Sequence, residues 1–162
     1  SGQLSENISV RYFPARTGYC SDRNCHDYSQ IKSESARIIE KYDKNLFISS
    51  SYALYIPENE LHSGEYRNNY YCVILDITKD KNTKFRKIEF PAGEYAICRY
   101  VGTSFDRNRT IEKLLAYISE NGYEVCGEAL QLCVIDENLT NIDSEKINEI
   151  QIAVRRAEKS DI

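Results

Sequence analysis

One pattern occurs twice in this chain, about 77 residues apart, and it constrains the fold more than any other feature. Phe-Pro-Ala at 13–15, followed by Tyr19 and Cys20, is echoed by Phe-Pro-Ala at 90–92, followed by Tyr95 and Cys98. A helix-like stretch follows each copy, at 31–42 and at 111–121, and two strand-like runs close each half. The repeat predicts two strand-helix-strand-strand units packed about a pseudo-two-fold axis, with a concave site at their seam.

Length and charge narrow the class of protein. A chain of 162 residues has the size of one domain, so the repeat divides one core. The formal net charge is −4 and no basic run occurs, which disfavours direct nucleic-acid binding. No apolar run approaches the ~20 residues of a membrane span, and no signal peptide is evident, so we expect a cytoplasmic protein without membrane contact.

The start of the chain suggests a missing segment. Ser1 and Gly2 come first and the sequence contains no methionine. We therefore expect a fragment whose preceding segment carries part of the function. Residues 1–7 are interpreted as an expression remnant or linker and 156–162 as a frayed tail. The domain is expected at 8–155, with halves at about 8–77 and 85–155.

Six cysteines form no C-x-x-C pair, and most lie in apolar runs, so reduced structural thiols are expected. Cys20, Cys25 and His26 are the only cluster that suggests a metal, and they lack a fourth ligand nearby. The sequence therefore predicts no metal and no cofactor.

Local patterns place the elements. Asp27 or Ser29 can cap a helix at about 28–42, and Gly122 suits the end of a helix at 111–121, where a positive φ is needed. Residues 57–69 and 78–84 are expected as loops, and 136–145 as an acidic hairpin loop. Strands are expected at 8–13, 51–56, 70–77, 130–135 and 149–154, and 87–101 as two strands or one bent strand.

Thirteen tyrosines and no tryptophan give an unusual aromatic balance. A tyrosine ring offers an apolar face and an electron-rich surface for cations, although aromatic residues also favour strands for packing reasons alone. The candidate ligand-binding tyrosines are Tyr52, Tyr55, Tyr71, Tyr95 and Tyr117.

Glu149 interrupts an otherwise apolar closing strand. The repeat offset matches it to Cys72, beside Tyr71, so we expect the two closing strands to approach each other near the pseudo-axis. A carboxylate there would be paired, hydrogen-bonded, protonated or waiting for a cation. The alternative is that Glu149 points into water.

The chain resembles a known family in Phe90–Ala96, Ile111–Tyr117, Gly127–Leu132 and Asn148–Ile152. These stretches are similar to the gyrase-inhibitor-like (GyrI-like) effector-binding domains, found as drug-sensing domains of MerR-type and AraC-type regulators and as stand-alone proteins. The resemblance implies an α+β fold, in which duplicated strand-helix-strand-strand units form a curved antiparallel sheet with two main helices. It also implies a groove walled by aromatic residues, and an acidic pocket residue at Glu149.

The aromatic positions of the family fall on Tyr52, Tyr71 and Tyr117, whereas Leu130 and Ala153 depart from its tyrosine and proline. The resemblance implies a regulator's effector-binding domain that takes lipophilic or aromatic cations, with Glu149 as counter-charge. DNA would be bound only through a missing N-terminal domain, and the full-length protein would be a homodimer. The alternatives are a hydrolase of small electrophiles with Glu149 as base, and a gyrase-binding or other protein-interaction module.

Overall fold

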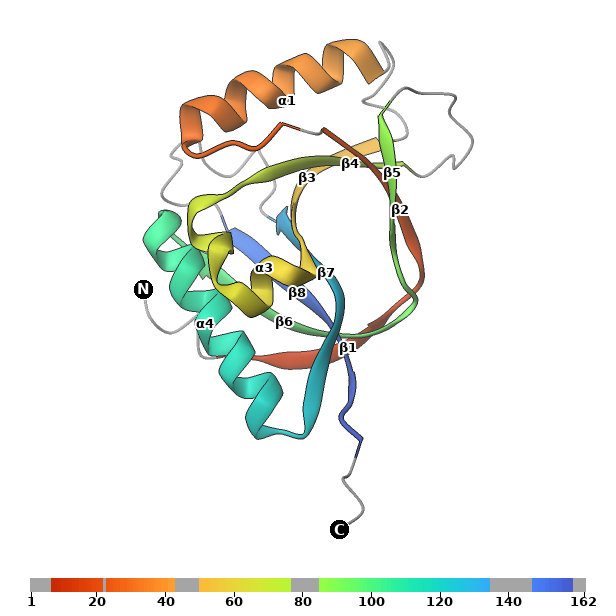
Figure 1. The fold of residues 1–162 in the computed structure, drawn as a ribbon, viewed down its shortest axis with the longest axis vertical. Coiled ribbons are helices and arrows are strands. Elements are labelled where there is room, and N and C mark those ends of the chain that lie inside the picture. The colour runs from red at the N-terminus through yellow and green to blue at the C-terminus, as the bar shows by residue number, and fades with distance from the viewer. Residues whose placement is uncertain (1–6, 22, 43–49, 77–84, 135–146, 159–162) are drawn as a thin grey trace.

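A single antiparallel sheet of eight strands organises the computed structural model, which describes residues 7–21, 23–42, 50–76, 85–134 and 147–158. The strand order is β1-β6-β8-β7-β3-β4-β2-β5. In Figure 1 the sheet curls until its two ends approach each other. The strands are β1 (Ser9–Phe13), β2 (Arg16–Cys20), β3 (Ser50–Ile56), β4 (Tyr71–Asp76), β5 (Arg86–Phe90), β6 (Gly93–Val101), β7 (Tyr123–Cys133) and β8 (Ile147–Arg156).

The strand order reads the same from both ends once the two halves are matched, which confirms the duplicated α+β fold. β1, β2, β3 and β4 of the first half correspond to β5, β6, β7 and β8 of the second. The first strands are exchanged, because β1 pairs with β6 and β5 pairs with β2. The strands that meet at the pseudo-axis are β3 and β7. The expectation that the closing strands β4 and β8 meet there is therefore wrong.

Each half begins with two strands, one more than the repeat suggested. β2 was not expected, because Pro14 and Gly18 read as breaks. Pro14 lies between the strands, and Gly18 is needed for packing, since a Cβ atom on it would lie 2.6 Å from Val73 Cγ2. The same Phe-Pro-Ala turn separates β5 from β6, which confirms two strands in 87–101.

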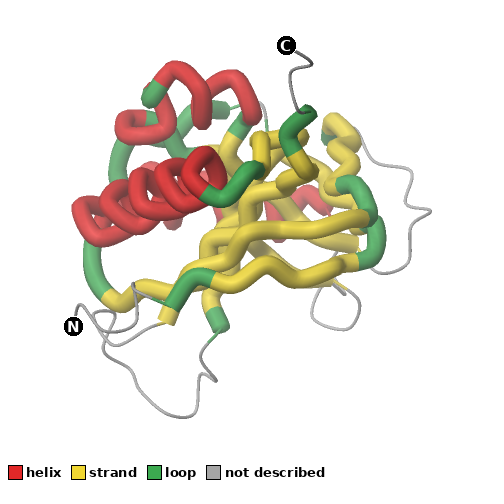
Figure 2. The backbone as a smooth tube through the Cα atoms, turned by 90° about the horizontal axis from the view of Figure 1, so that it is seen from below, coloured by secondary structure: helices red, strands yellow, loops and turns green. Residues whose placement is uncertain are grey.

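Two long helices cover the outside of the curve (Figures 1 and 2). They are α1 (Tyr28–Tyr42) and α4 (Ser104–Glu120). Asp27 caps α1, because its Oδ1 accepts a hydrogen bond of 2.8 Å from Gln30 N. α4 starts seven residues earlier than expected, at a cap in which Thr103 N donates to Asp106 Oδ2 at 2.9 Å. Gly122 follows it with φ +77°, as predicted.

The segment 57–69 is helical, not a loop. It holds α3 (Glu58–Ser63) and the 3₁₀-helix η2 (Glu65–Asn68), joined at Gly64 with φ +86°. β7 also begins at Tyr123, seven residues before the expected strand, since the charged and small residues of 123–129 hid its period. The loops expected at 78–84 and 136–145 lie outside the described residues.

Side chains alternate between an outer and an inner face of the sheet. The outer face packs under the helices. Ile152 packs in a cluster with Ile111 and Leu114 of α4, and Ile74 packs in a cluster with Ile38 of α1. The inner face carries two smaller clusters, one around Tyr55, Phe90 and Leu130, the other around Tyr95, Ile97 and Ala153.

Buried Arg107 on α4 ties the halves together on the outer side. Its Nη1 donates to Tyr66 O at 2.9 Å and its Nε to Gln131 Oε1 at 2.8 Å. The guanidinium also lies 4.3 Å above the Tyr70 ring. None of the described helices is long and apolar enough to span a membrane.

Candidate functional site

One row of side chains crosses the inner face and joins the two halves. Residues directly opposite each other in neighbouring strands share a face. The register places Ile97, Gln151, Leu130, Tyr55 and Tyr71 opposite one another in turn, on β6, β8, β7, β3 and β4. The inner face is therefore built from both repeats. The sequence analysis expected the ligand site where the two halves meet.

Glu149 lies at one end of this face, two residues before Gln151 on β8. It is 5% exposed, so it does not point into water. Arg99 Nε donates to Glu149 Oε1 at 2.9 Å, and Gln151 Nε2 donates to Oε2 at 2.6 Å. The Arg99 side chain is itself 52% exposed. Glu149 is thus a buried carboxylate that already has a cationic partner.

The register also changes the residue that corresponds to Glu149. Gly18 on β2 lies opposite Leu75, and its counterpart Tyr95 on β6 lies opposite Ala153. Counting back along β4 and β8 from these pairs matches Glu149 to Tyr71. The sequence offset gave Cys72, whose side chain packs on the outer face. A shift of one residue turns a strand's side chains to the other face, so the difference matters.

Arg16 is linked to Glu149 through Gln151, and it was not found from the sequence. Its Nη1 donates to Gln151 Oε1 at 2.7 Å, although Arg16 lies on β2 and Gln151 on β8. The guanidinium carbon lies 4.6 Å from the Phe13 ring centroid and 4.9 Å from that of Tyr95. Comparison of the repeats offers one signal for Arg16, because the matching position in the second half is Gly93.

The opposite end of the face holds a pair of tyrosines. The rings of Tyr55 and Tyr71 are stacked, with centroids 5.4 Å apart and planes inclined by 30°. The Tyr71 hydroxyl donates to Glu60 Oε2 at 2.5 Å, and Asn69 Nδ2 donates to Oε1 at 3.0 Å. Burial raises the pKa of both tyrosines, and in Tyr71 the hydrogen bond to Glu60 adds to the effect. Both phenols therefore stay protonated at neutral pH.

Two carboxylates accompany these tyrosines. Glu60 on α3 is 5% exposed, and both of its described donors, Tyr71 and Asn69, are neutral. Glu128 lies in an irregular stretch of β7, where register shifts between Val125 and Ala129, and its Oε2 accepts a hydrogen bond of 2.6 Å from Glu58 N. Burial raises the pKa of Glu128. Neither glutamate was expected from the sequence, which gave 57–69 as a loop and offered no signal for Glu60.

The remaining predicted site residues are dispersed. Tyr95 is on the inner face, but it is fully buried and its hydroxyl donates to Pro91 O at 2.7 Å. Tyr117 is on α4, which packs against the outer face, so the fold does not bring it to the other tyrosines. The side chain of Tyr52 lies outside the described residues.

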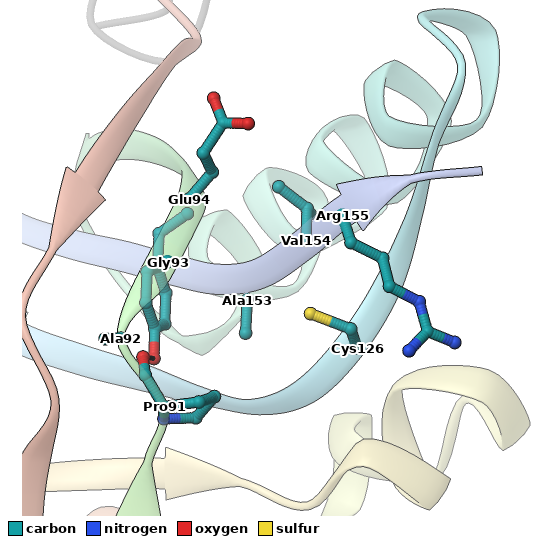
Figure 3. Close-up of a pocket in the computed structure, with 9 residues that line it drawn as sticks. Pro91, Ala92, Gly93, Glu94, Cys126, Ala153, Val154 and Arg155 are labelled. Carbon is teal, nitrogen blue, oxygen red and sulfur yellow. Dashed lines mark hydrogen bonds between the residues drawn. The ribbon is translucent and has the colours of Figure 1, made fainter. Parts of the chain in front are cut away.

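A small pocket opens where the Phe-Pro-Ala turn of the second half meets β7 and β8. Its volume is about 160 Å³. Its walls include Pro91, Gly93, Tyr95, Cys126 and Ala153. Figure 3 shows Cys126 pointing toward Ala153. Gly93 contributes no side chain, and a Cβ atom there would have no neighbour within 4 Å.

The described residues contain no group of three or more His, Cys, Asp or Glu side chains placed to hold a metal ion. In the cluster considered from the sequence, Cys20 packs on the inner face and Cys25 on the outer face. The sheet separates these two thiols.

Comparisons with known proteins agree with this architecture. The family model described as GyrI-like small molecule binding domain matches residues 16–155. The crystal structure of the EcmrR C-terminal domain superimposes with a TM-score of 0.72 at 14% identity, covering 93% of this chain and 98% of that one. A comparison with curated protein sequences found no match.

Two other solved structures share the fold more loosely. SAV2435 bound to tetraphenylphosphonium has a TM-score of 0.55 at 14% identity, covering 92% of this chain and 94% of that one. A hydrolase encoded by lin2189 from Listeria innocua has a TM-score of 0.55 at 8% identity, covering 94% of each chain. At these identities the likeness concerns the fold.

Proposed function

Because the chain belongs to the family of GyrI-like small molecule binding domains, we propose that it is the effector-sensing domain of a bacterial transcription regulator of the MerR type. Its effector is an aromatic or lipophilic cation that binds on the inner face of the curved sheet. The likeness to the EcmrR C-terminal domain and to SAV2435 bound to tetraphenylphosphonium supports the proposal.

The observation that carries the proposal is the buried Glu60 beside the stacked pair Tyr55 and Tyr71. Among the described residues only neutral groups donate to this carboxylate, so none of those contacts supplies a counter-charge that would offset its desolvation. The tyrosine rings add an electron-rich surface, and a desolvated cation–π contact contributes up to about 2 kcal/mol. Glu128 supplies a second carboxyl group near the same rings. A cation bound here would gain from charge and from stacking together.

The counter-charge therefore moves from Glu149 to Glu60 and Glu128. Glu149 was expected to wait for a cation, but Arg99 and Gln151 bind both of its oxygens. A cationic ligand that paired with Glu149 would share the carboxylate with Arg99. Glu149 remains a member of the site as the partner of Arg99.

DNA recognition is assigned to a segment that is not part of this chain. The net charge of −4 and the absence of a basic run in the sequence disfavour binding of this domain to phosphate groups. Dimerisation of the full-length protein is part of the same proposal. The isolated chain is expected not to bind duplex DNA in a fluorescence anisotropy titration at moderate salt.

A hydrolase, the alternative from the sequence, is less well supported by the site. A general base needs an oxygen that is free to accept a proton from water. Both oxygens of Glu149 accept hydrogen bonds, from Arg99 and from Gln151, and none of the described contacts brings a tyrosine hydroxyl to it. The arrangement favours binding over catalysis by Glu149.

The test compares three charge-removing variants with two classes of dye. Rhodamine 6G is the cationic dye, and a neutral coumarin is its counterpart. Glu60→Gln and Glu128→Gln should each weaken binding of the cationic dye by about 2 kcal/mol, roughly 30-fold, and should leave binding of the neutral dye unchanged. Glu149→Gln should change the cationic dye little. Glu40→Gln, an exposed change on α1, controls for net charge.

A tyrosine pair of variants separates stacking from hydrogen bonding. Tyr71→Phe keeps the ring against Tyr55, and Tyr71→Ala removes it. We expect Tyr71→Ala to weaken both dyes and Tyr71→Phe to weaken neither strongly. If Glu149→Gln abolished cation binding while Glu60→Gln and Glu128→Gln left it intact, the counter-charge would be Glu149 after all. Absence of binding by either dye would reject the sensing function.

A further inference from the structure

Arg16 is a cation on the inner face of the sheet, and two of its three guanidinium nitrogens have no hydrogen-bond partner among the described residues. Its guanidinium lies against the rings of Phe13 and Tyr95, which also contact each other edge to face, and Nη1 donates to Gln151. Among the described residues, the buried Nε and Nη2 atoms have no partner in hydrogen-bond geometry. These two nitrogens lie on one side of the guanidinium. They form the fork that a carboxylate binds with two parallel hydrogen bonds.

The charges around Arg16 do not balance. Gln151 links Arg16 to Glu149, and Glu149 is paired with Arg99. This connected group therefore contains two guanidinium groups and one carboxylate, a surplus of one positive charge. A buried charge is costly unless it is paired, and the charge of Glu149 is already paired with Arg99. The chemistry that completes the group is an anion with two oxygens.

The two ends of the inner face carry different charged groups, although the tyrosine end also holds one cation, Arg86, whose Nη2 donates to the Tyr55 hydroxyl at 3.0 Å. Glu60 and Glu128 accompany the tyrosine pair, and Arg16 and Arg99 accompany Glu149. The row from Gln151 through Leu130 to Tyr55 spans two strand spacings, about 10 Å. A ligand at the tyrosine end leaves the Arg16 end without its missing counter-charge.

The pocket at Gly93 adds space for a ring next to this positive end. Arg16 and Gly93 are equivalent in the repeat, so the second half is open where the first half carries a long side chain. The pocket volume of about 160 Å³ is close to that of a cavity that holds one benzene ring. Tyr95 lines the pocket, and its ring centroid lies 4.9 Å from the Arg16 guanidinium carbon. Tyr95 therefore connects the pocket to Arg16.

We infer that the Arg16 end of the inner face binds the carboxylate of an aromatic acid. Nε and Nη2 of Arg16 hold the two oxygens, and the ring lies toward Tyr95 and the Gly93 pocket. The inference rests on the proposed sensing function, because it names a second class of ligand for the same inner face. The two proposed ligands differ in charge, because the group that recognises this second ligand is a cation and the ligand is an anion.

The experiment uses three ligands of one shape and three charges. Benzoate is an anion at neutral pH, benzamide is neutral and benzamidine is a cation. Their affinities for the chain are measured by ligand-observed NMR titration into the millimolar range. We expect benzoate to bind at least tenfold more tightly than benzamide.

Variants then locate the anion. Arg16→Gln keeps a donor for Gln151 but removes the charge. It should lower the affinity for benzoate at least tenfold and change the affinity for benzamide less than twofold. Arg16→Lys keeps the charge without the fork and should retain part of the benzoate affinity. Glu149→Gln, which raises the positive surplus, should strengthen benzoate. Arg109→Gln, an exposed change of equal charge on α4, should leave all three ligands unchanged.

Several outcomes would overturn the inference. The inference is wrong if benzoate fails to bind, if it binds no better than benzamide, or if it binds Arg16→Gln as tightly as it binds the parent chain. A rise in benzamidine affinity in Arg16→Gln, with benzoate unaffected, would show that Arg16 is a resident cation that keeps other cations out. If benzoate fails but the cationic dye binds, only this inference is lost. If neither binds, the sensing function is rejected as well. Circular dichroism and thermal unfolding of Arg16→Gln and Arg16→Lys establish that each variant is folded.

Discussion

Arg16 and Gly93 occupy equivalent positions in the two halves, and they make the halves unequal. Each follows a Phe-Pro-Ala turn, and each opens the second strand of its repeat. Arg16 extends across the interior to Gln151 at 2.7 Å, whereas Gly93 leaves a pocket of about 160 Å³. The same position of the repeat thus carries a long charged side chain in the first half and no side chain in the second. This difference contributes to the shape and charge of the inner face.

Glycine substitutions should separate close packing from backbone strain. Gly18→Ala places a Cβ atom 2.6 Å from Val73 Cγ2, so we expect a loss of about 1–3 kcal/mol in the free energy of unfolding. Gly93→Ala meets no atom within 4 Å, but Gly93 has φ +150°, and we expect a loss of about 1 kcal/mol. Urea unfolding measures both.

A second substitution distinguishes the two causes. Val73→Ala should recover part of the loss in Gly18→Ala, because it removes the clashing methyl groups. The same change should not rescue Gly93→Ala. Equal rescue of both variants would contradict the assignment of the Gly93 effect to backbone conformation.

The pair Arg99–Glu149 should respond unequally to loss of either partner. Arg99→Gln leaves a buried carboxylate without its cation, and should cost about 1–2 kcal/mol, less than a fully buried pair because Arg99 is 52% exposed. Glu149→Gln removes the buried charge itself and should cost less. A double-mutant cycle measured by urea unfolding should give a coupling energy that shows a favourable interaction between Arg99 and Glu149. Additive effects of the two changes would show that the ion pair contributes nothing.

Stability should fall in acid partly through Glu34. Burial opposes its charge, but hydrogen bonds from Arg37 and Ser21 outweigh it and hold the pKa of Glu34 below its usual value. A lowered pKa stabilises the fold above the unfolded-state pKa, and the contribution is lost as pH falls through the folded-state pKa. Glu34→Gln should therefore cost about 1–2 kcal/mol at neutral pH and nothing near pH 2. An equal cost at both pH values would contradict this explanation.

The six cysteines should react with a thiol reagent in the order of their exposure. Cys133 is exposed and Cys126 half-buried, so they should react first and second in the native protein. Cys20, Cys25, Cys72 and Cys98 are buried and should react only on unfolding, and burial raises the pKa of Cys25 to about 11, which leaves little reactive thiolate. Titration of the unfolded chain without reductant should count six thiols. A count of four or fewer would refute the prediction of reduced cysteines.

The sequence by itself determined the features that depend on interactions between residues close together in the chain. The repeat, the span of α1, the Asp27 cap and the positive φ of Gly122 all follow from side-chain periods and from capping chemistry within a few residues. The α+β class and the two equivalent halves follow from the duplication. The apolar stripe by which α4 packs on the sheet was likewise predicted from the helical period alone. It contains Ile111, Leu114 and Ile118.

Only the tertiary structure decided which residues meet on the inner face. The exchange of β1 and β5 between the halves, and the place of β3 and β7 at the pseudo-axis, are non-local pairings that no sequence window contains. Face assignment in strands also has a period of two, so a repeat offset wrong by one residue matched Glu149 to Cys72 instead of Tyr71. Arg16 reaches Gln151 across 135 residues of sequence, because curvature brings β2 and β8 to face each other. The charges of the site therefore follow from the curl of the sheet, which the sequence pattern does not record.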